Sequence, residues 1–168
     1  MAKRIVAGLA AGAAGTLALN VTSYLDMLVR GRPASELPGK VAGRIADEIG
    51  MPLDFGLSET ARENGNGGDS GAAAEKNRQE ALGALLGYAN GLGIGLGYAI
   101  IRLVLPRPPT WLAGAALGSL AMAASDYPAT RLGLTDPKTW SGADWMADVV
   151  PHMAYGVAAA FTFEAIKK

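Results

Sequence analysis

The sequence contains no cysteine and a single histidine, His152, among its 168 residues. The absence of cysteine excludes a disulfide framework, a thiolate nucleophile and any metal site built from cysteine ligands. One histidine leaves too few ligands for a self-contained zinc site, or for a bis-histidine haem within one chain. Because the formal net charge is zero, no overall basic field attracts nucleic acid. We therefore expect no metal, no cofactor and no nucleic-acid partner.

Charged residues are also scarce, at 18% of the chain against about 25% in a typical soluble domain. Four segments are long and apolar, at about residues 5–29, 82–105, 111–132 and 145–166. A bilayer core requires about 20 apolar residues, which the third segment reaches only if it continues past Pro128. We predict an all-α fold, an integral membrane bundle of four transmembrane helices that forms a single membrane domain over residues 1–168. The alternative is a buried, soluble helical bundle, whose helices would alternate polar and apolar faces.

Basic residues are distributed unevenly over the ends of these segments. One side of the predicted bundle comprises the N-terminus, the short turn at residues 102–110 and the C-terminus. That side carries a single acid, Glu164, and a group of basic residues: Lys3, Arg4, Arg102, Arg107, Lys167 and Lys168. Since Lys and Arg accumulate in short cytoplasmic loops, we predict that both termini are cytoplasmic and that the two longer loops face outward.

The long polar connection at residues 30–80 contains a helical pattern of its own. Leu37, Val41, Ile45 and Ile49 recur every fourth residue and so share one helical face. This spacing predicts an amphipathic helix on the membrane surface or over the mouth of the bundle, with a solvated connector as the alternative. The sequence ENGNGGDSG, residues 63–71, has the composition of a flexible hinge.

Glycine is abundant and regularly spaced in the second apolar segment. Four glycines fall on one stripe of the expected helix: Gly83, Gly87, Gly91 and Gly95. Small residues let helix backbones approach each other closely in lipid, where no hydrophobic force drives association. The stripe predicts a glycine zipper, either inside a tightly packed bundle or at the seam of a homo-oligomer. A glycine-lined path for a solute is the alternative.

Polar residues inside the apolar segments form the next signal. Asp148, His152 and Tyr155 share a helical face through their i, i+4, i+7 spacing. Such residues are costly in lipid unless they face protein or water. We predict a polar pocket near the outer surface from the following set: Asp26, Asp126, Asp148, His152 and Tyr155. Alternatively these side chains only anchor loops, because the sequence SGAD predicts a capped helix start shortly before Asp148.

The sequence RLGLTDPKTWSGADWMADVVPHMAYG resembles the C-terminal part of the YagU-like proteins, an uncharacterised group of bacterial inner-membrane proteins. The resemblance rests on a Gly-Leu-Thr turn, a following proline, and an acid four residues before a histidine. In this chain the matching positions are Gly133, Leu134, Thr135, Pro137, Asp148 and His152. The resemblance implies a small multi-helix protein of the bacterial inner membrane without an established activity.

The motifs of common enzymes are missing. The sequence has no hydrolase nucleophile elbow, phosphate-binding loop or dinucleotide fingerprint, so we expect a protein that is not an enzyme. The first hypothesis is a structural or accessory subunit that lies in the lipid bilayer and packs into a homo-oligomer or a larger membrane complex. The alternative is a small transporter or proton-linked membrane protein that uses Asp126, Asp148 and His152.

Overall fold

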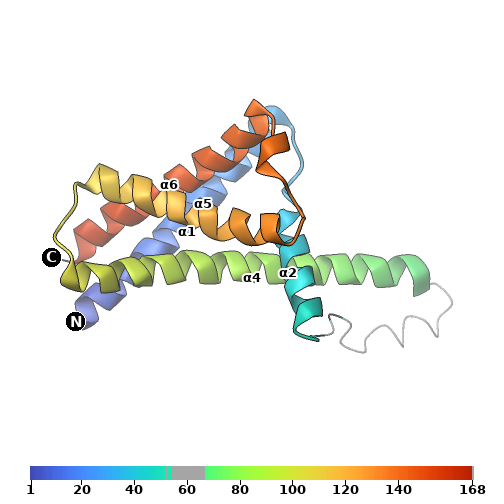
Figure 1. Ribbon diagram of the computed structural model, residues 1–168, viewed down its shortest axis with the longest axis horizontal. Coiled ribbons are helices and arrows are strands. Elements are labelled where there is room, and N and C mark those ends of the chain that lie inside the picture. The colour runs from blue at the N-terminus through green and yellow to red at the C-terminus, as the bar shows by residue number, and fades with distance from the viewer. Residues whose placement is uncertain (52, 54–66, 168) are drawn as a thin grey trace.

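The computed structural model describes residues 1–51, 53 and 67–167, and all regular structure within them is helical (Figure 1). The all-α prediction is therefore confirmed. The elements in chain order are α1 (Ala2–Arg30), α2 (Leu37–Glu48), α4 (Gly67–Val104), α5 (Thr110–Arg131), the short 3-10 helix η1 (Pro137–Thr139) and α6 (Gly142–Ile166). The predicted hinge at residues 63–71 lies partly outside the described residues, and its second half, from Gly67, is helical instead.

Three of the described helices are long and apolar enough to cross a membrane: α1, residues Ala73–Val104 of α4, and α6. The third predicted segment, residues 111–132, folds as the helix α5, but α5 is not among them. Its second half carries Ser125, Asp126 and Arg131, which lower its hydropathy. The structure is thus compatible with a membrane protein in which three of the described helices could span the bilayer, and the predicted count of four is not confirmed.

Helix ends lie where local sequence signals place them. Ser141 accepts a hydrogen bond from the backbone N–H of Asp144 at 3.2 Å, and the Asp144 carboxylate accepts one from the Ser141 N–H at 2.9 Å. This reciprocal pair satisfies two backbone donors at the start of α6. Gly31 ends α1 in the left-handed conformation, with φ 64°, and its N–H donates to the carbonyl of Met27 at 2.8 Å.

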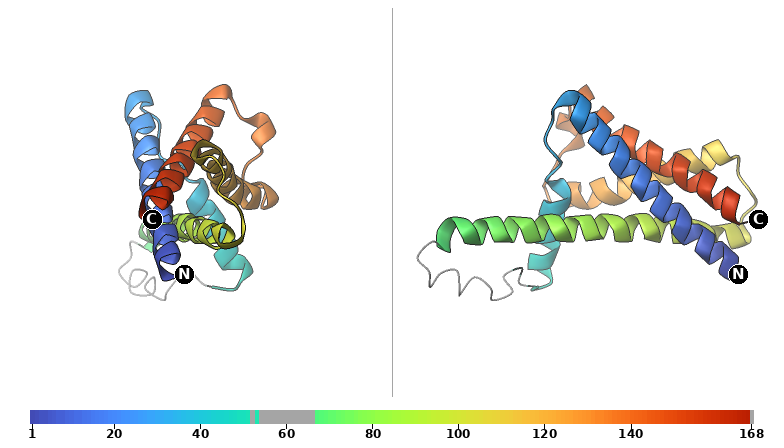
Figure 2. Two further views of the ribbon diagram at one scale, coloured as in Figure 1. Left: turned by 90° about the vertical axis from the view of Figure 1, so that its left-hand side faces the viewer. Right: turned by 180° about the vertical axis from the view of Figure 1, so that it is seen from behind.

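The helices form two layers that cross each other. Helices α1 and α6 lie side by side and run diagonally over the pair α4 and α5 (Figures 1 and 2). Both termini and the turn between α4 and α5 gather at one end of the molecule (Figure 1). We call this the terminal end. The end of α1 and the start of α6 lie at the opposite end.

Helix α2 lies crosswise on α4 (Figure 1). A Cβ atom added to Gly83 would lie 2.6 Å from the backbone N of Gly39, so the two backbones touch directly. If this crossing marks the membrane surface, residues 83–104 of α4 cover about 33 Å, close to the roughly 30 Å hydrocarbon core of a bilayer. The part of α4 before the crossing then extends beyond the membrane.

The face of α2 that packs against the rest of the molecule differs from the predicted one. The buried residues of α2 are small: Gly39, Ala42, Gly43 and Ala46. The predicted aliphatic row is half-buried at Leu37, Val41 and Ile45, and Ile49 is 64% exposed. Close approach of two backbones requires the small face at the contact, which leaves the aliphatic row beside it.

Candidate functional site

Helices α5 and α6 are held together by direct contact between their backbones. A Cβ atom on Gly156 would clash with the backbones of Gly114 and Gly118. One on Gly118 would lie 2.7 Å from the carbonyl oxygen of His152. Because the two helices run in opposite directions, this contact brings the last turns of α5 next to the first turns of α6. A cluster of polar side chains lies at that junction.

This polar cluster consists of Ser125 and Asp126 from α5 and Asp148 and His152 from α6. The His152 Nδ1 atom lies 2.8 Å from the carbonyl oxygen of Asp148 and 3.3 Å from its carboxylate Oδ1. A carbonyl oxygen only accepts, so Nδ1 carries a proton. The other ring nitrogen, Nε2, lies 3.4 Å from the Ser125 hydroxyl. The ring is therefore oriented by groups from both helices.

The acidic members of the polar cluster are close together and incompletely paired. The Asp126 carboxyl lies near enough to Asp148 to interact with it, and the Ser125 hydroxyl lies 3.3 Å from Asp126 Oδ1. The second carboxylate oxygen of Asp148 is buried without a hydrogen-bond partner. Two adjacent carboxylates repel each other, and a proton or a protonated imidazole between them relieves that repulsion. The arrangement is chemically suited to holding a proton.

Asp26 interacts with basic residues at the end of α1. Asp26 forms ion pairs with Arg30, at 2.7 Å, and with Arg32. Arg30 in turn donates to the carbonyl of Ala143 at 3.3 Å. Asp26 therefore links the end of α1 to the start of α6. The interactions of Asp26 are thus with Arg30 and Arg32, and its place in a single pocket with Asp126, Asp148 and His152 stays a prediction.

Tyr155 lies in the core of the molecule. Its side chain is 1% exposed, and its hydroxyl donates to the carbonyl of Gly91 on α4 at 2.6 Å. A Cβ atom on Gly15 of α1 would lie 2.6 Å from the Tyr155 ring. The residue thus fills the junction of α1, α4 and α6. It belongs to the core and not to the polar cluster.

The glycine stripe of α4 is divided between two surroundings. A Cβ atom on Gly91 would clash with the Thr16 hydroxyl, and one on Gly95 would lie 2.6 Å from the backbone N of Gly12. Gly83 meets α2 in the same way. Gly87 has nothing within 4 Å of an added Cβ. Gly87 therefore makes no close helix contact within the described chain, although it lies between the α2 contact at Gly83 and the α1 contact at Gly91.

Sequence reasoning did not identify a second charged cluster, at the terminal end. Glu164 is 9% exposed and is contacted by Arg107 at 2.7 Å, Lys167 at 2.6 Å and Arg102 at 3.9 Å. The i, i+3 spacing of Glu164 and Lys167 was the available signal. The contribution of the two arginines depends on how the α4–α5 turn folds back on α6.

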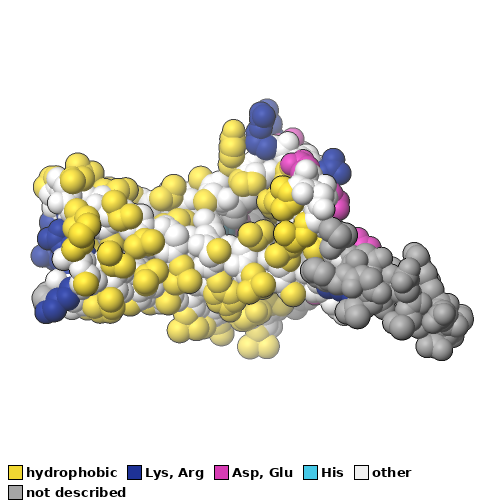
Figure 3. Space-filling view, turned by 90° about the horizontal axis from the view of Figure 1, so that it is seen from below, with side chains coloured by type: hydrophobic (Ala, Val, Ile, Leu, Met, Phe, Trp, Pro, Cys, Tyr) yellow, Lys and Arg dark blue, Asp and Glu magenta, His cyan; other side chains and the backbone are white. Residues whose placement is uncertain are grey.

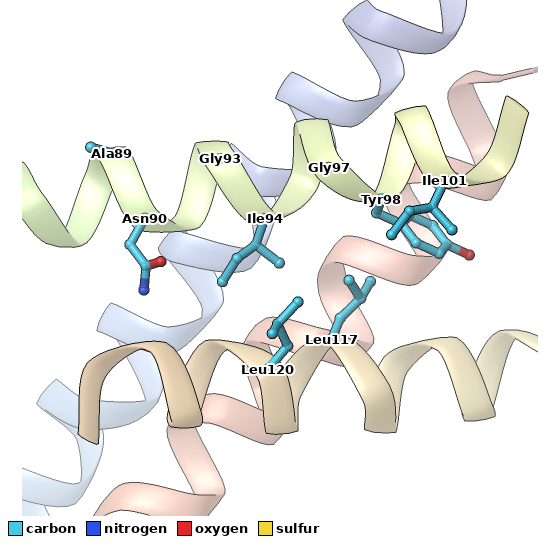
Figure 4. A pocket seen from close by; sticks show the side chains of 9 residues that line it. All are labelled: Ala89, Asn90, Gly93, Ile94, Gly97, Tyr98, Ile101, Leu117 and Leu120. Carbon is cyan, nitrogen blue, oxygen red and sulfur yellow. The ribbon is translucent and has the colours of Figure 1, made fainter. Parts of the chain in front are cut away.

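A groove lies between residues 89–101 of α4 and the middle of α5 (Figure 4). This α4–α5 groove has a volume of about 380 Å³. Asn90, Ile94 and Tyr98 point into it from α4, and Leu117 and Leu120 from α5 (Figure 4). The polar cluster does not line it.

Among the described residues, no group of three or more histidine, cysteine or acidic side chains is placed to hold a metal ion. Comparison with protein families, with curated proteins and with solved structures finds no match. The resemblance to the YagU-like proteins therefore stays a prediction.

Proposed function

We propose that this chain is a small integral protein of the bacterial inner membrane, with cytoplasmic termini and a structural or accessory role in a homo-oligomer or a larger membrane complex. Its surface supports a location in the bilayer. On the face shown in Figure 3, hydrophobic side chains cover the body of the molecule, whereas charged side chains gather toward its ends. Large apolar residues are exposed on separate helices, such as Leu17, Leu85 and Phe161 at 65%, 64% and 62%. Lipid is the natural solvent for such a surface.

The closed interior is the observation that carries the accessory role. Along α6, between the polar cluster and Glu164, lie four residues that are at most 1% exposed: Tyr155, Ala159, Ala160 and Phe163. The Phe163 ring packs against Tyr98, with ring centroids 4.8 Å apart. In the described part of the chain, α6 thus offers no run of polar side chains from one end to the other. A scaffold fits this interior better than a conduit.

Native mass spectrometry of the protein extracted gently from its own membrane tests this role. We expect a complex heavier than one chain, either a homo-oligomer or an assembly with a larger partner. A monomer at every protein concentration would contradict the accessory role.

A proton-linked function is the second candidate, and the polar cluster favours it. Asp126, Asp148 and His152 come from two helices and meet around one imidazole ring. Flux driven by a pH gradient in liposomes tests this function. We expect His152→Ala to abolish flux if the cluster moves protons, whereas Tyr127→Phe, an exposed position on α5, should leave it unchanged. No flux above that of empty liposomes would exclude the candidate.

A further inference from the structure

The α4–α5 groove has the dimensions and lining of a site for a hydrocarbon chain. Its walls are apolar apart from Asn90 and the Tyr98 hydroxyl. On α4 the groove extends over residues 89–101, which is about 18 Å along the helix axis. One leaflet of a bilayer has a hydrocarbon depth of about 15 Å, half of the roughly 30 Å core. The groove therefore matches the length of an acyl chain in one leaflet.

A smaller cavity, which Arg102 lines, adjoins the groove at the terminal end. Tyr98 and Ile101 line both spaces. The smaller cavity has a volume of about 270 Å³ and ends at Arg102, Leu105, Pro106 and Pro108. An apolar groove next to a guanidinium group is complementary to both parts of an anionic lipid, the acyl chain and the negatively charged headgroup.

Arg102 has capacity to bind an anion. Its side chain is 8% exposed, and its Nε atom is buried without a hydrogen-bond partner. One terminal nitrogen donates to the carbonyl of Leu105 at 3.0 Å, and the other lies 3.9 Å from Glu164. A buried donor without a partner is costly, and a phosphate oxygen would satisfy it with a charge-assisted hydrogen bond.

The charge of the terminal end is also complementary to an anion. Glu164 is the only described acid there, and it is already paired with Arg107 and Lys167. The described basic residues of this end are Lys3, Arg4, Arg102, Arg107 and Lys167. In the proposed membrane location this excess positive charge would lie at the level of the lipid headgroups, and anionic headgroups are attracted to such sites.

We propose that the α4–α5 groove holds one acyl chain of an anionic phospholipid, whose phosphate group is bound by Arg102 with help from Arg107. The ligand comes from the leaflet that faces the terminal end. This proposal rests on the location in the membrane and not on the accessory role. A monomeric protein would still bind the lipid, and an oligomer without the lipid would leave the accessory role intact.

Lipid titration monitored by native mass spectrometry tests the headgroup contact. The full chain in detergent micelles is titrated with phosphatidylglycerol or with phosphatidylcholine of the same acyl chains. We expect one tightly bound phosphatidylglycerol per chain and weaker binding of phosphatidylcholine. Arg107→Gln, at a side chain that is 63% exposed, should weaken phosphatidylglycerol binding about fivefold and leave phosphatidylcholine binding unchanged. Arg102→Gln should have a larger effect, since this side chain lines the cavity.

A matched pair of glycine variants tests the groove. A Cβ atom on Gly97 meets nothing within 4 Å, and Gly97 lines the groove. The leucine of Gly97→Leu can therefore fill the groove without disturbing a helix contact, and we expect at least tenfold weaker binding of both lipids. Gly87→Leu has equally open surroundings but lies outside the groove lining, so its lipid binding should equal that of the wild type. Far-UV circular dichroism checks that both variants fold.

Four results would overturn the proposal. Equal affinity for the two lipids would remove the headgroup contact. Equal effects of Gly97→Leu and Gly87→Leu would indicate lipid that surrounds the protein without a defined site. Displacement of the lipid by millimolar inorganic phosphate would indicate a site for free anions that does not use the groove. A dimer that dissociates on Gly97→Leu would show that a second copy of the chain occupies the groove.

Discussion

At the scale of single residues, Tyr155 joins α6 to α4 through one hydrogen bond. Its hydroxyl donates to the Gly91 carbonyl at 2.6 Å in a buried environment. Tyr155→Phe keeps the ring and removes this bond, so we expect the free energy of unfolding to fall by about 1 kcal/mol. The measurement is the midpoint of denaturant unfolding in detergent micelles.

The control for this prediction is Tyr127→Phe. Tyr127 is 67% exposed on α5, so the same chemical change should alter the free energy of unfolding by less than about 0.5 kcal/mol. Equal effects of the two variants would show that the Tyr155 bond does not stabilise the core.

Two glycines one turn apart on α4 lead to opposite predictions. A side chain at Gly91 would clash with Thr16, whereas one at Gly87 meets nothing within 4 Å. Gly91→Leu should therefore destabilise the fold by about 1–3 kcal/mol or more, as overpacking does. Gly87→Leu should leave the monomer as stable as the wild type. Unfolding in mixed detergent micelles compares them, and equal stability would contradict the close contact between α1 and α4.

At the scale of helices, the sequence predicted much of the secondary structure because its signals are local. The Ser141–Asp144 capping box fixes the start of α6 through residues three apart. Composition likewise identified the long apolar helices. The contacts between helices were not predictable from such local signals. The stripe of α4 is continuous in sequence, yet Gly83 contacts α2, Gly91 contacts α1 and Gly87 contacts neither.

In the candidate site, too, contacts within one helix were predictable and contacts between helices were not. The i, i+4 spacing placed Asp148 beside His152, and this pair was predictable from one helix alone. Ser125 joins the pair only through the antiparallel contact of α5 with α6. Asp26 lies at a similar depth in its own helix but is paired with two arginines. Position along a helix does not determine which side chains a neighbouring helix presents.

Helix α2 is attached to α4 partly by an ion pair outside the predicted membrane core. Lys76 donates to Glu36 at 2.8 Å, and Lys40 lies 3.2 Å from the same carboxylate. Hydrogen bonds from Lys76 and then Lys40 hold the pKa of Glu36 below its ordinary value of 4.5. A lowered pKa means that the pair stabilises the attachment above pH 4.5, and that this stabilisation is lost as the pH falls through the pKa of the folded state.

We therefore expect Glu36→Gln to loosen α2 at pH 7 and to have no effect at low pH. Hydrogen exchange of the α2 amides measures this, and the increase at pH 7 should be no more than a few-fold, because the pair is exposed. At a pH low enough to protonate Glu36 in the folded state, the wild type and the variant should exchange alike, relative to their intrinsic rates. A difference of the same size at both pH values would show that the side chain acts through packing and not through its charge.

At the scale of the whole molecule, the distribution of charge distinguishes the two ends. The terminal end has one described acid, Glu164, against five basic side chains, whereas the opposite end holds both signs in ion pairs such as Asp26–Arg30. Basic residues accumulate on the cytoplasmic side of membrane proteins. The two-layer bundle brings both termini and the α4–α5 turn to the same end (Figure 1). A single orientation therefore places all three basic segments on the cytoplasmic side.

The orientation can be measured directly, because the chain has no cysteine of its own. Ser35→Cys, just before α2, and Lys3→Cys, in the first turn of α1, place single thiols at exposed positions on opposite ends. In intact spheroplasts, a maleimide that cannot cross the membrane should label Ser35→Cys and leave Lys3→Cys unlabelled, and lysis should expose both. Labelling of Lys3→Cys alone would reverse the orientation. The basic terminal end would then face outward, and the proposed phospholipid would have to come from the outer leaflet.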